Sequence, residues 1–335
     1  MKVGILSFAH VHAPGYARCL AAMPDIELVA IADDDATRGE AAVAQFGGTW
    51  HADYRDLLAR DDVAAVIVTS PNASHREMVV AAAAAGKHVL CEKPLATTRL
   101  DALAMIAACR AHGVKLMTAF PMRFSPAALA LRAAVQADEA GTPRAVMATN
   151  HGKMPPGWFS DPVLAGGGAV MDHTVHVADL LRWIFGCEIT RVYAEVDTRI
   201  HPGIPTDDVA LLLMEMENGM FASLDPSWAR PATWPTWGGL TMDVIGDRGV
   251  VAMNAFNQNF QRYDDRTERY SLLPWSEGGD PAMLRAFFDA VAHDTEPPIT
   301  GEDGLRALEV ALCAYESARR HEPVACPGAL AGAAG

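Results

Sequence analysis

The sequence predicts an α/β domain with a parallel sheet, followed by an α+β domain with a large, mostly antiparallel open sheet. Over residues 1–121, short apolar runs alternate with alanine-rich amphipathic stretches, as in βαβ units. Over residues 122–325, strand signals follow one another with few helices between them. The length of 335 residues allows two cores. Residues 326–335, mostly alanine and glycine, are expected to be a disordered tail.

The first domain is expected to contain a strand at each of five apolar runs. Helix start and stop signals lie between the third and fourth runs and between the fourth and fifth runs. Ser74 with Glu77 resembles a capping box, as does Thr98 with Asp101. The expected strands are Val3–Leu6, Glu27–Ala32, Ala64–Thr69, His88–Cys91 and Lys115–Ala119.

The second domain is expected to begin with a helix and a strand, then a helix that follows the glycine run 166–168. The later strands are separated by turn signals such as Asn218-Gly219. The expected helices are Pro126–Ala137, Asp172–Phe185, Asp280–Ala292 and Glu302–Arg320, and the expected strands are Arg144–Asn150, Arg191–Asp197, Asp208–Glu215, Met220–Ser227, Leu240–Ile245 and Gly249–Asn254.

Composition narrows the classes of partner. The net charge is −14 and no basic patch stands out, which argues against nucleic acid and against an anionic membrane. The sequence contains no window of eighteen apolar residues, so no membrane span is expected. The six cysteines form no CxxC pair, so reduced thiols in a cytoplasmic protein are expected.

The strongest functional signal is Glu92-Lys93-Pro94, directly after the apolar run 87–91. Ligands of open α/β sheets bind outside the carboxyl ends of the strands. A lysine at this point is placed to act on a substrate, and the proline restricts the turn that follows.

The first strand leads into a glycine-poor turn. A dinucleotide fold favours glycine here, for a tight turn and a close approach to phosphate. This chain has Ser7 and Ala9 at the first two glycine positions and His12 at the third. Two interpretations remain: an ordinary turn, or a turn whose small residues leave room for a phosphate at a helix N-terminus.

The next two strands end in polar residues. Asp33 follows the second strand at the distance expected for a carboxylate that binds the ribose of NAD, which favours NAD over NADP. The alternative is that aspartates 33–35 only cap a helix. Asn72 and His75 follow the third strand and can lie beside a cofactor, although Asn72 can also be an N-cap.

Asp172, His176 and Asp179 share one helix face at spacings of four and three residues. A carboxylate one turn from a histidine suits a general base, and a purely structural hydrogen bond is the alternative. His173 is expected to be exposed. Two ligands are too few to predict a metal site.

A tryptophan-rich stretch, with Trp228, Trp234 and Trp237, suits either sugar stacking or a structural role, and the structural role is slightly favoured. Lys153 and Trp158 are further candidates for the rim of a substrate pocket.

Two long motifs carry a family resemblance. Residues 69–96, through Glu92-Lys93-Pro94, resemble the signature of the Gfo/Idh/MocA oxidoreductases (glucose–fructose oxidoreductase and inositol dehydrogenase). Residues 166–179, which include Asp172 and His176, resemble the second signature of that family, with Thr174 where many members have glycine. The order of elements matches over about residues 1–320.

The resemblance implies a Rossmann domain that binds NAD(P) and a second domain whose open sheet mediates a homodimer or homotetramer. It implies reversible hydride transfer from a carbinol of a sugar, cyclitol or related polyol to nicotinamide. Two alternatives remain open: an NAD-dependent glycosidase that oxidises transiently and eliminates, and a non-catalytic cofactor-sensing regulator.

Residue roles follow from the same motifs. Lys93, Asp172 and His176 are the expected catalytic residues, and either Lys93 or His176 serves as the base. Lys153 and Trp158 join these three at the substrate. The expected cofactor contacts are Ser7, Ala9, His10, Val11, Asp33, Ser70, Pro71, Asn72, His75, Glu92, Lys93 and Arg123, the last from the element Arg123-Phe124-Ser125-Pro126. No metal is expected.

Overall fold

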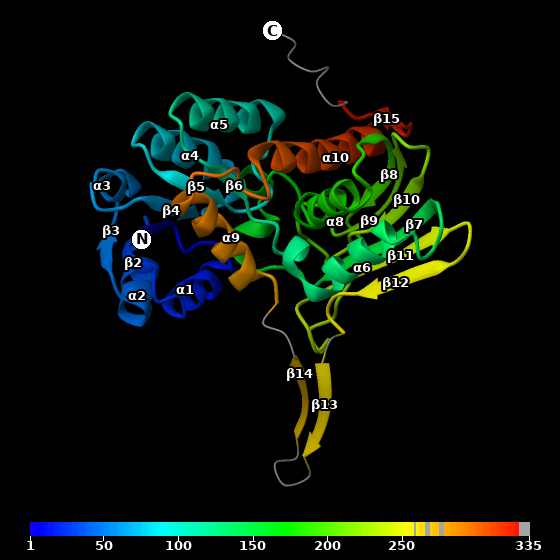
Figure 1. Cartoon of the computed structure of the whole chain (residues 1–335), viewed down its shortest axis with the longest axis horizontal. Coiled ribbons are helices and arrows are strands. Elements are labelled where there is room, and N and C mark those ends of the chain that lie inside the picture. The colour runs from blue at the N-terminus through cyan, green and yellow to red at the C-terminus, as the bar shows by residue number, and fades with distance from the viewer. Residues whose placement is uncertain (258, 265–268, 275–277, 328–335) are drawn as a thin grey trace. The chain divides into compact units, whose positions relative to one another are not determined.

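A computed structural model describes residues 1–257, 259–264, 269–274 and 278–327 (Figure 1). They form two compact units. The first contains Met1–Pro121, Asp161–Gly166 and Asp280–Leu308, and the second contains Met122–Ser160, Gly167–Gly279 and the described residues from Glu309 onward. Residues 161–166 and 280–308, expected in the second domain from the sequence, belong to the first unit. Residues 280–308 return to the first unit, where α9 (Asp280–Ala292) packs against α1 (Ala13–Ala21).

The first unit contains a six-stranded parallel sheet in the order β3-β2-β1-β4-β5-β6, which confirms the predicted α/β class. The central strands are buried on both faces, as in a doubly wound sheet. The short strand β3 was not predicted. The strands are β1 Lys2–Leu6, β2 Glu27–Ala32, β3 Thr49–His51, β4 Ala65–Val68, β5 His88–Cys91 and β6 Leu116–Thr118.

Helices cover both faces of this sheet. Figure 1 shows α4 and α5 side by side, with α1 and α2 on the opposite side of the sheet. The Thr98 hydroxyl caps α5 as predicted, by accepting the Asp101 amide. Ser74 makes no capping bond, because a preceding 3-10 turn leaves it with helical backbone angles. The remaining helices are α2 Ala36–Phe46, α3 Tyr54–Leu58, α4 His75–Ala84, α5 Arg99–Ala111 and α7 Pro162–Ala165, with the 3-10 turn η1 at Asn72–Ser74.

The second unit contains a seven-stranded sheet in the order β12-β11-β7-β10-β9-β8-β15. Its neighbouring strands are antiparallel, except for the parallel pair β10 and β7. This confirms the predicted mostly antiparallel sheet. The strands are β7 Pro143–Gly152, β8 Ile189–Asp197, β9 Val209–Met216, β10 Phe221–Asp225, β11 Gly238–Gly246, β12 Val250–Asn254 and β15 Val324–Ala325. A separate hairpin joins β13 Asn259–Asp264 to β14 Arg269–Pro274.

Helices α6 (Pro126–Gln136) and α8 (Ala169–Phe185) pack together and cover this sheet. The 3-10 turn η2 (Pro121–Phe124) lies directly before α6, and the 3-10 turn η3 (Gly157–Ser160) follows β7. Helix α10 (Gly301–Arg320) is the last long element. Cys326, which opens the expected tail, is buried and donates its amide to Thr190, whereas 328–335 lie outside the described residues.

Among the described residues, no helix combines the length and the apolar character that a membrane span needs. The six cysteines are free thiols.

Candidate functional site at the ends of β1, β4 and β5, and on α8

The turn after β1 has the backbone geometry of a glycine turn although it lacks glycine. Ser7 has φ +72°, in the left-handed region that favours glycine. Its amide donates to Ala32 at 2.6 Å, and its Oγ accepts the Ala9 amide at 3.1 Å. A Cβ added at Gly15 in the first turn of α1 would meet nothing within 4 Å. The turn therefore follows the tight path that a dinucleotide fold favours at this position.

Asp33 joins the end of β2 to this turn. Its carboxylate accepts the Phe8 amide at 2.6 Å and the Asp35 amide at 2.8 Å, and it pairs with Arg38 through Nε at 2.8 Å and Nη2 at 2.7 Å. Asp35, not Asp33, caps α2, by accepting the Arg38 amide. Arg38 is a neighbour of Asp33 that sequence reasoning missed.

Glu92, directly after β5, forms the centre of a buried hydrogen-bond network. Its Oε1 accepts the Tyr16 hydroxyl at 2.6 Å and lies 2.9 Å from His12 Nδ1 and 3.7 Å from His10 Nδ1. Its Oε2 accepts the Lys93 amide at 3.0 Å. The network connects the turn after β1 to the element that carries Lys93.

The network fixes the charges of its members. Burial alone would raise the pKa of Glu92, but His10, His12 and the other donors lower it well below its ordinary value. Burial and the Glu92 carboxylate both raise the pKa of Tyr16. For His12, burial lowers the pKa, and the Glu92 carboxylate more than reverses this, so that the pKa is raised.

Among the described residues, His10, His12 and Glu92 offer ligand atoms that lie within 4.8 Å of one another, close enough to consider a metal ion. The atoms are already engaged, however. His10 Nδ1 accepts the His12 amide at 3.1 Å, and Glu92 Oε1 accepts Tyr16. Because these lone pairs take part in hydrogen bonds, the cluster is better described as a network that holds protons than as a metal site.

The raised pKa of His12 predicts a pH dependence of stability. Protonated His12 stabilises the fold fully below the ordinary value of 6.5, and the contribution is lost as pH rises through the higher folded value. The expected loss is below about 1 kcal/mol, because the side chain is 35% exposed. Urea unfolding of wild type and His12→Gln from about pH 5 to about pH 8 measures it. The difference between the two proteins should shrink as pH rises; a constant difference would show that His12 is not the titrating group.

Asn72 and His75, at the end of β4, contact backbone carbonyls of the first unit. The Asn72 amide donates to the Ala165 carbonyl at 2.8 Å. The fully buried His75 ring lies 3.1 Å from the Pro94 carbonyl and 3.2 Å from the Ser70 carbonyl. Burial lowers the pKa of His75. The His75 ring thus contacts both the segment after Lys93, at Pro94, and the end of β4, at Ser70.

Helix α8 begins three residues before the predicted start because a buried carboxylate caps it. Asp207 accepts the Gly168 and Val170 amides, each at 2.8 Å, and the Tyr315 hydroxyl at 2.7 Å. A Cβ at Gly168 would lie 1.9 Å from the Asp207 carbonyl oxygen, so this position needs glycine. The glycine run thus brings the helix start against another backbone.

Removing this cap is expected to destabilise the second unit. Asp207→Ala removes the carboxylate that accepts the Gly168 and Val170 amides, which should cost about 1–3 kcal/mol in urea unfolding. The Tyr315 hydroxyl, 3.0 Å from the Gly168 amide, remains as an acceptor for Gly168 alone. Asp53→Ala removes an exposed cap of α3 and is the matched control, expected to cost less. Equal losses in the two variants would refute the role of burial.

The carboxylate of Asp172 has two neighbours that sequence reasoning missed. Its Oδ2 accepts Trp228 Nε1–H at 3.1 Å and lies 3.2 Å from His173 Nε2. His173 is buried, so the expectation that it is exposed was wrong. Its ring packs against Gly152 of β7, and its Nδ1 lies 2.8 Å from the Pro226 carbonyl oxygen. His176 follows one turn after Asp172 on α8.

Asp179, the last member of the predicted stripe, binds Arg123. Arg123 Nε donates to Asp179 Oδ2 at 2.8 Å and Nη2 donates to Oδ1 at 2.5 Å. The side chains are 7% and 1% exposed. Arg123 was predicted to approach nicotinamide. Its described contact is a buried ion pair with Asp179 on α8.

The predicted rim residues lie in the second unit. Lys153 Nζ donates to the Ala232 carbonyl at 2.9 Å, and the backbone amide of Lys153 donates to the Trp237 carbonyl at 2.9 Å. Trp158 stacks on Phe159 with ring centroids 4.0 Å apart. Trp228 is fully buried, whereas Trp234 and Trp237 are exposed. The structural interpretation therefore holds for Trp228.

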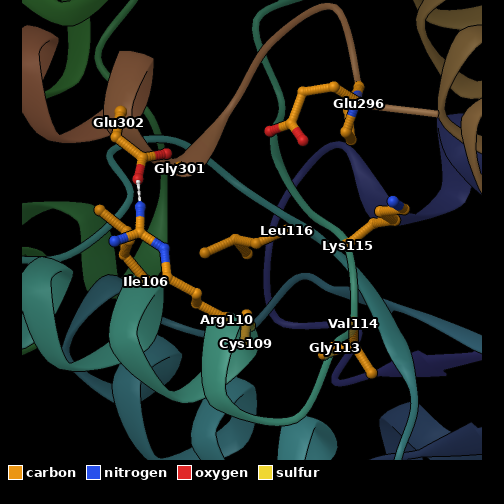
Figure 2. Close-up of a pocket in the computed structure, with 11 residues that line it drawn as sticks. Ile106, Cys109, Arg110, Gly113, Val114, Lys115, Leu116, Glu296, Gly301 and Glu302 are labelled. Carbon is orange, nitrogen blue, oxygen red and sulfur yellow. Dashed lines mark hydrogen bonds and ion pairs between the residues drawn. The ribbon is translucent and has the colours of Figure 1, made fainter.

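The first unit contains a cavity of about 210 Å³. Figure 2 shows Leu116 between the end of α5 and the loop that leads into α10, with Arg110 paired to Glu302 at 2.8 Å. The cavity is at the amino end of β6, and none of the predicted site residues lines it. It is therefore not the predicted substrate site.

The sheet order and the polar strand ends define the class: a dinucleotide-binding α/β domain joined to an α+β domain. Residues 2–120 match the model of an oxidoreductase family with an NAD-binding Rossmann fold, and residues 128–252 match the GFO/IDH/MocA C-terminal domain. The chain belongs to the Gfo/Idh/MocA family of oxidoreductases, as its motifs predicted.

Two curated proteins and one solved structure are similar to this chain over most of its length. The chain is 32% identical over 303 residues to 1,5-anhydro-D-fructose reductase of Ensifer adhaerens, covering 87% of this chain and 89% of that protein. It is 30% identical over 329 residues to myo-inositol 2-dehydrogenase of Thermotoga maritima, covering 95% and 96%. The crystal structure of GenD2 from gentamicin A biosynthesis, in complex with NAD, superposes with a TM-score of 0.90 at 26% identity, covering 98% and 97%.

Proposed function

We propose that this protein is an NAD-dependent dehydrogenase that reversibly oxidises a carbinol of a sugar, cyclitol or related polyol. The observation that carries the proposal is the placement of Lys93. It is buried at the carboxyl end of β5, in a sheet whose order gives a switch point between β1 and β4. Ligands of such sheets bind at this edge. The relatives that are named for sugars and inositol support the substrate class.

NAD, when bound, supplies the hydride acceptor. Lys93 donates a hydrogen bond to the substrate oxygen and stabilises the charge that develops there. His176 takes the hydroxyl proton, and Asp172 orients the substrate. Lys153 and Trp158 bind the remainder of the substrate. Ser7, Ala9, His10 and Val11 contact the pyrophosphate of the cofactor.

The choice of NAD over NADP rests on charge. Asp33, Asp34 and Asp35 place three carboxylates at the end of β2 against one guanidinium, that of Arg38. A 2′-phosphate would meet net negative charge here, whereas the ribose hydroxyls of NAD can donate to a carboxylate.

A panel of polyols, cyclitols and sugar acids, scored by NADH absorbance with NADP as a parallel arm, tests the proposal. The expected result is turnover with at least one carbinol substrate and a higher kcat/KM for NAD. Product formation without net NADH would replace the dehydrogenase by a redox-neutral glycosidase. Bound NAD without turnover on any substrate would favour a regulatory protein.

We also propose that the protein is a homo-oligomer through the open face of its second sheet. Leu211 and Leu213 on β9, Met147 on β7 and Phe221 on β10 are between 47% and 62% exposed. The strand register aligns Leu213, Ser223 and Met147 in one row across three strands. Such an exposed apolar row is typical of an interface.

Leu213→Glu is expected to shift the protein to a smaller species in light scattering after gel filtration. The exposed charge reversal Glu27→Lys in the first unit serves as a control and should leave the mass unchanged. A wild-type protein that is monomeric at all concentrations would refute this interface.

A further inference from the structure

The His173 ring lies between two hydrogen-bond acceptors. Nδ1 is 2.8 Å from the Pro226 carbonyl, which can only accept, so Nδ1 carries a proton. Nε2 is 3.2 Å from Asp172 Oδ2. A neutral imidazole has a single N–H. If His173 were neutral and Asp172 ionised, a lone pair on Nε2 would face a carboxylate oxygen.

The surroundings make that contact costly. The side chains of His173 and Asp172 are 9% and 11% exposed, so little water screens them. Trp228 donates to the same carboxylate oxygen but cannot supply a second proton to the pair. A Cβ added at Gly152 would lie 2.5 Å from His173 Cε1, which shows how tightly β7 packs on the ring. The ring therefore cannot turn away without moving the strand.

We propose that Asp172 and His173 share one proton at neutral pH, and that His173 is a positioning residue that sets the charge of Asp172. The proton can reside on Nε2, as an imidazolium beside a carboxylate, or on the Asp172 carboxyl. In both forms the pair has no net charge. The consequence for substrate rests on the proposed function: a charge-balanced pair suits an uncharged hydroxyl rather than an amine.

Other titratable side chains of the second unit lie next to residues that contact this pair. On β7, His151 lies next to Gly152, and at the end of β10, Asp225 lies next to Pro226; these two pair with each other at 2.9 Å. His201 Nε2 lies 2.9 Å from the Trp228 carbonyl. Asp172, on the same helix as His173, supplies the carboxylate that faces Nε2 of the ring.

Nitrogen-15 NMR of histidine-labelled protein, without substrate or cofactor, tests the proposal directly. His173→Gln identifies the signal, and the exposed His112→Gln serves as an assignment control. At neutral pH both ring nitrogens should have shifts of the protonated form, or Nδ1 alone should be protonated with a protonated Asp172 carboxyl seen by carbon-13. In Asp172→Asn, His173 should become neutral. A neutral His173 beside an ionised Asp172 overturns the proposal.

The pH profile of KM supplies a second readout if His173→Gln folds poorly or the signal overlaps. With His173 replaced by glutamine, Asp172 should titrate alone, so KM should rise about tenfold or more toward acid pH while kcat changes little. A variant with an unchanged KM profile contradicts the positioning role. If no substrate is found, the NMR result still stands or falls by itself, so failure of the proposed function is distinguishable.

Discussion

Lys93→Ala is expected to lower kcat by about 10²–10⁴ while NAD binding is largely retained. Lys93 is 4% exposed and follows β5, and its backbone amide is fixed by Glu92 Oε2 at 3.0 Å. The side chain therefore leaves a rigid strand end rather than a mobile loop, which is the condition for stabilising charge at a defined point. Loss of the ammonium group removes this stabilisation and leaves the cofactor turn after β1 in place.

Steady-state kinetics and NAD titration by calorimetry measure the two quantities separately. Lys87→Met is the matched control. Lys87 is also a buried lysine of the first unit, and its Nζ donates to the Arg60 carbonyl at 2.8 Å. The control should lose stability and retain kcat. Normal turnover in Lys93→Ala would remove Lys93 from the mechanism.

Asp179→Ala is expected to cost about 3–5 kcal/mol of unfolding free energy, the largest stability effect predicted here. The variant leaves the Arg123 guanidinium buried without its bidentate partner. An isolated buried charge costs far more than the ion pair contributes, because the desolvation of the remaining charge is no longer compensated. The second unit, which contains α8, should therefore unfold at lower urea concentration.

The double variant Arg123→Met with Asp179→Leu separates this cause from simple loss of packing. It removes both charges and should recover most of the lost stability. Asp25→Ala, which breaks the exposed pair with Arg285, should cost below about 1 kcal/mol. A double variant as unstable as Asp179→Ala would show that the burial of charge is not the cause.

The sequence predicted most elements because their signals are local. The bounds of β2, β5 and α9 agree with the predicted runs, and Thr98 caps α5 as its spacing to Asp101 indicated. Apolar runs, caps and glycine turns act within a few residues. The shortest elements that were missed, β3, α3, α7 and β15, have two to five residues, which is too few for a periodic signal. The hairpin strands β13 and β14 were missed as well.

The candidate site was predictable only in part. Lys93, Asp172 and His176 lie in motifs with fixed spacing, so they could be named from the sequence. Tyr16 and His12 contact Glu92 from 76 and 80 residues away, and Asp207 caps α8 from 39 residues away. No linear pattern connects such positions, because contact depends on which strand ends lie at the same edge of the sheet.

The sequence by itself determined the class of fold, the family and the position of the lysine after β5, since these depend on local patterns and on motif order. Only the tertiary structure decided the protonation partners: Glu92 with His12 and Tyr16, Asp179 with Arg123, and Asp172 with His173. The physical reason is that charge in a protein is set by burial and by the nearest donors and acceptors, which the fold gathers from distant parts of the chain.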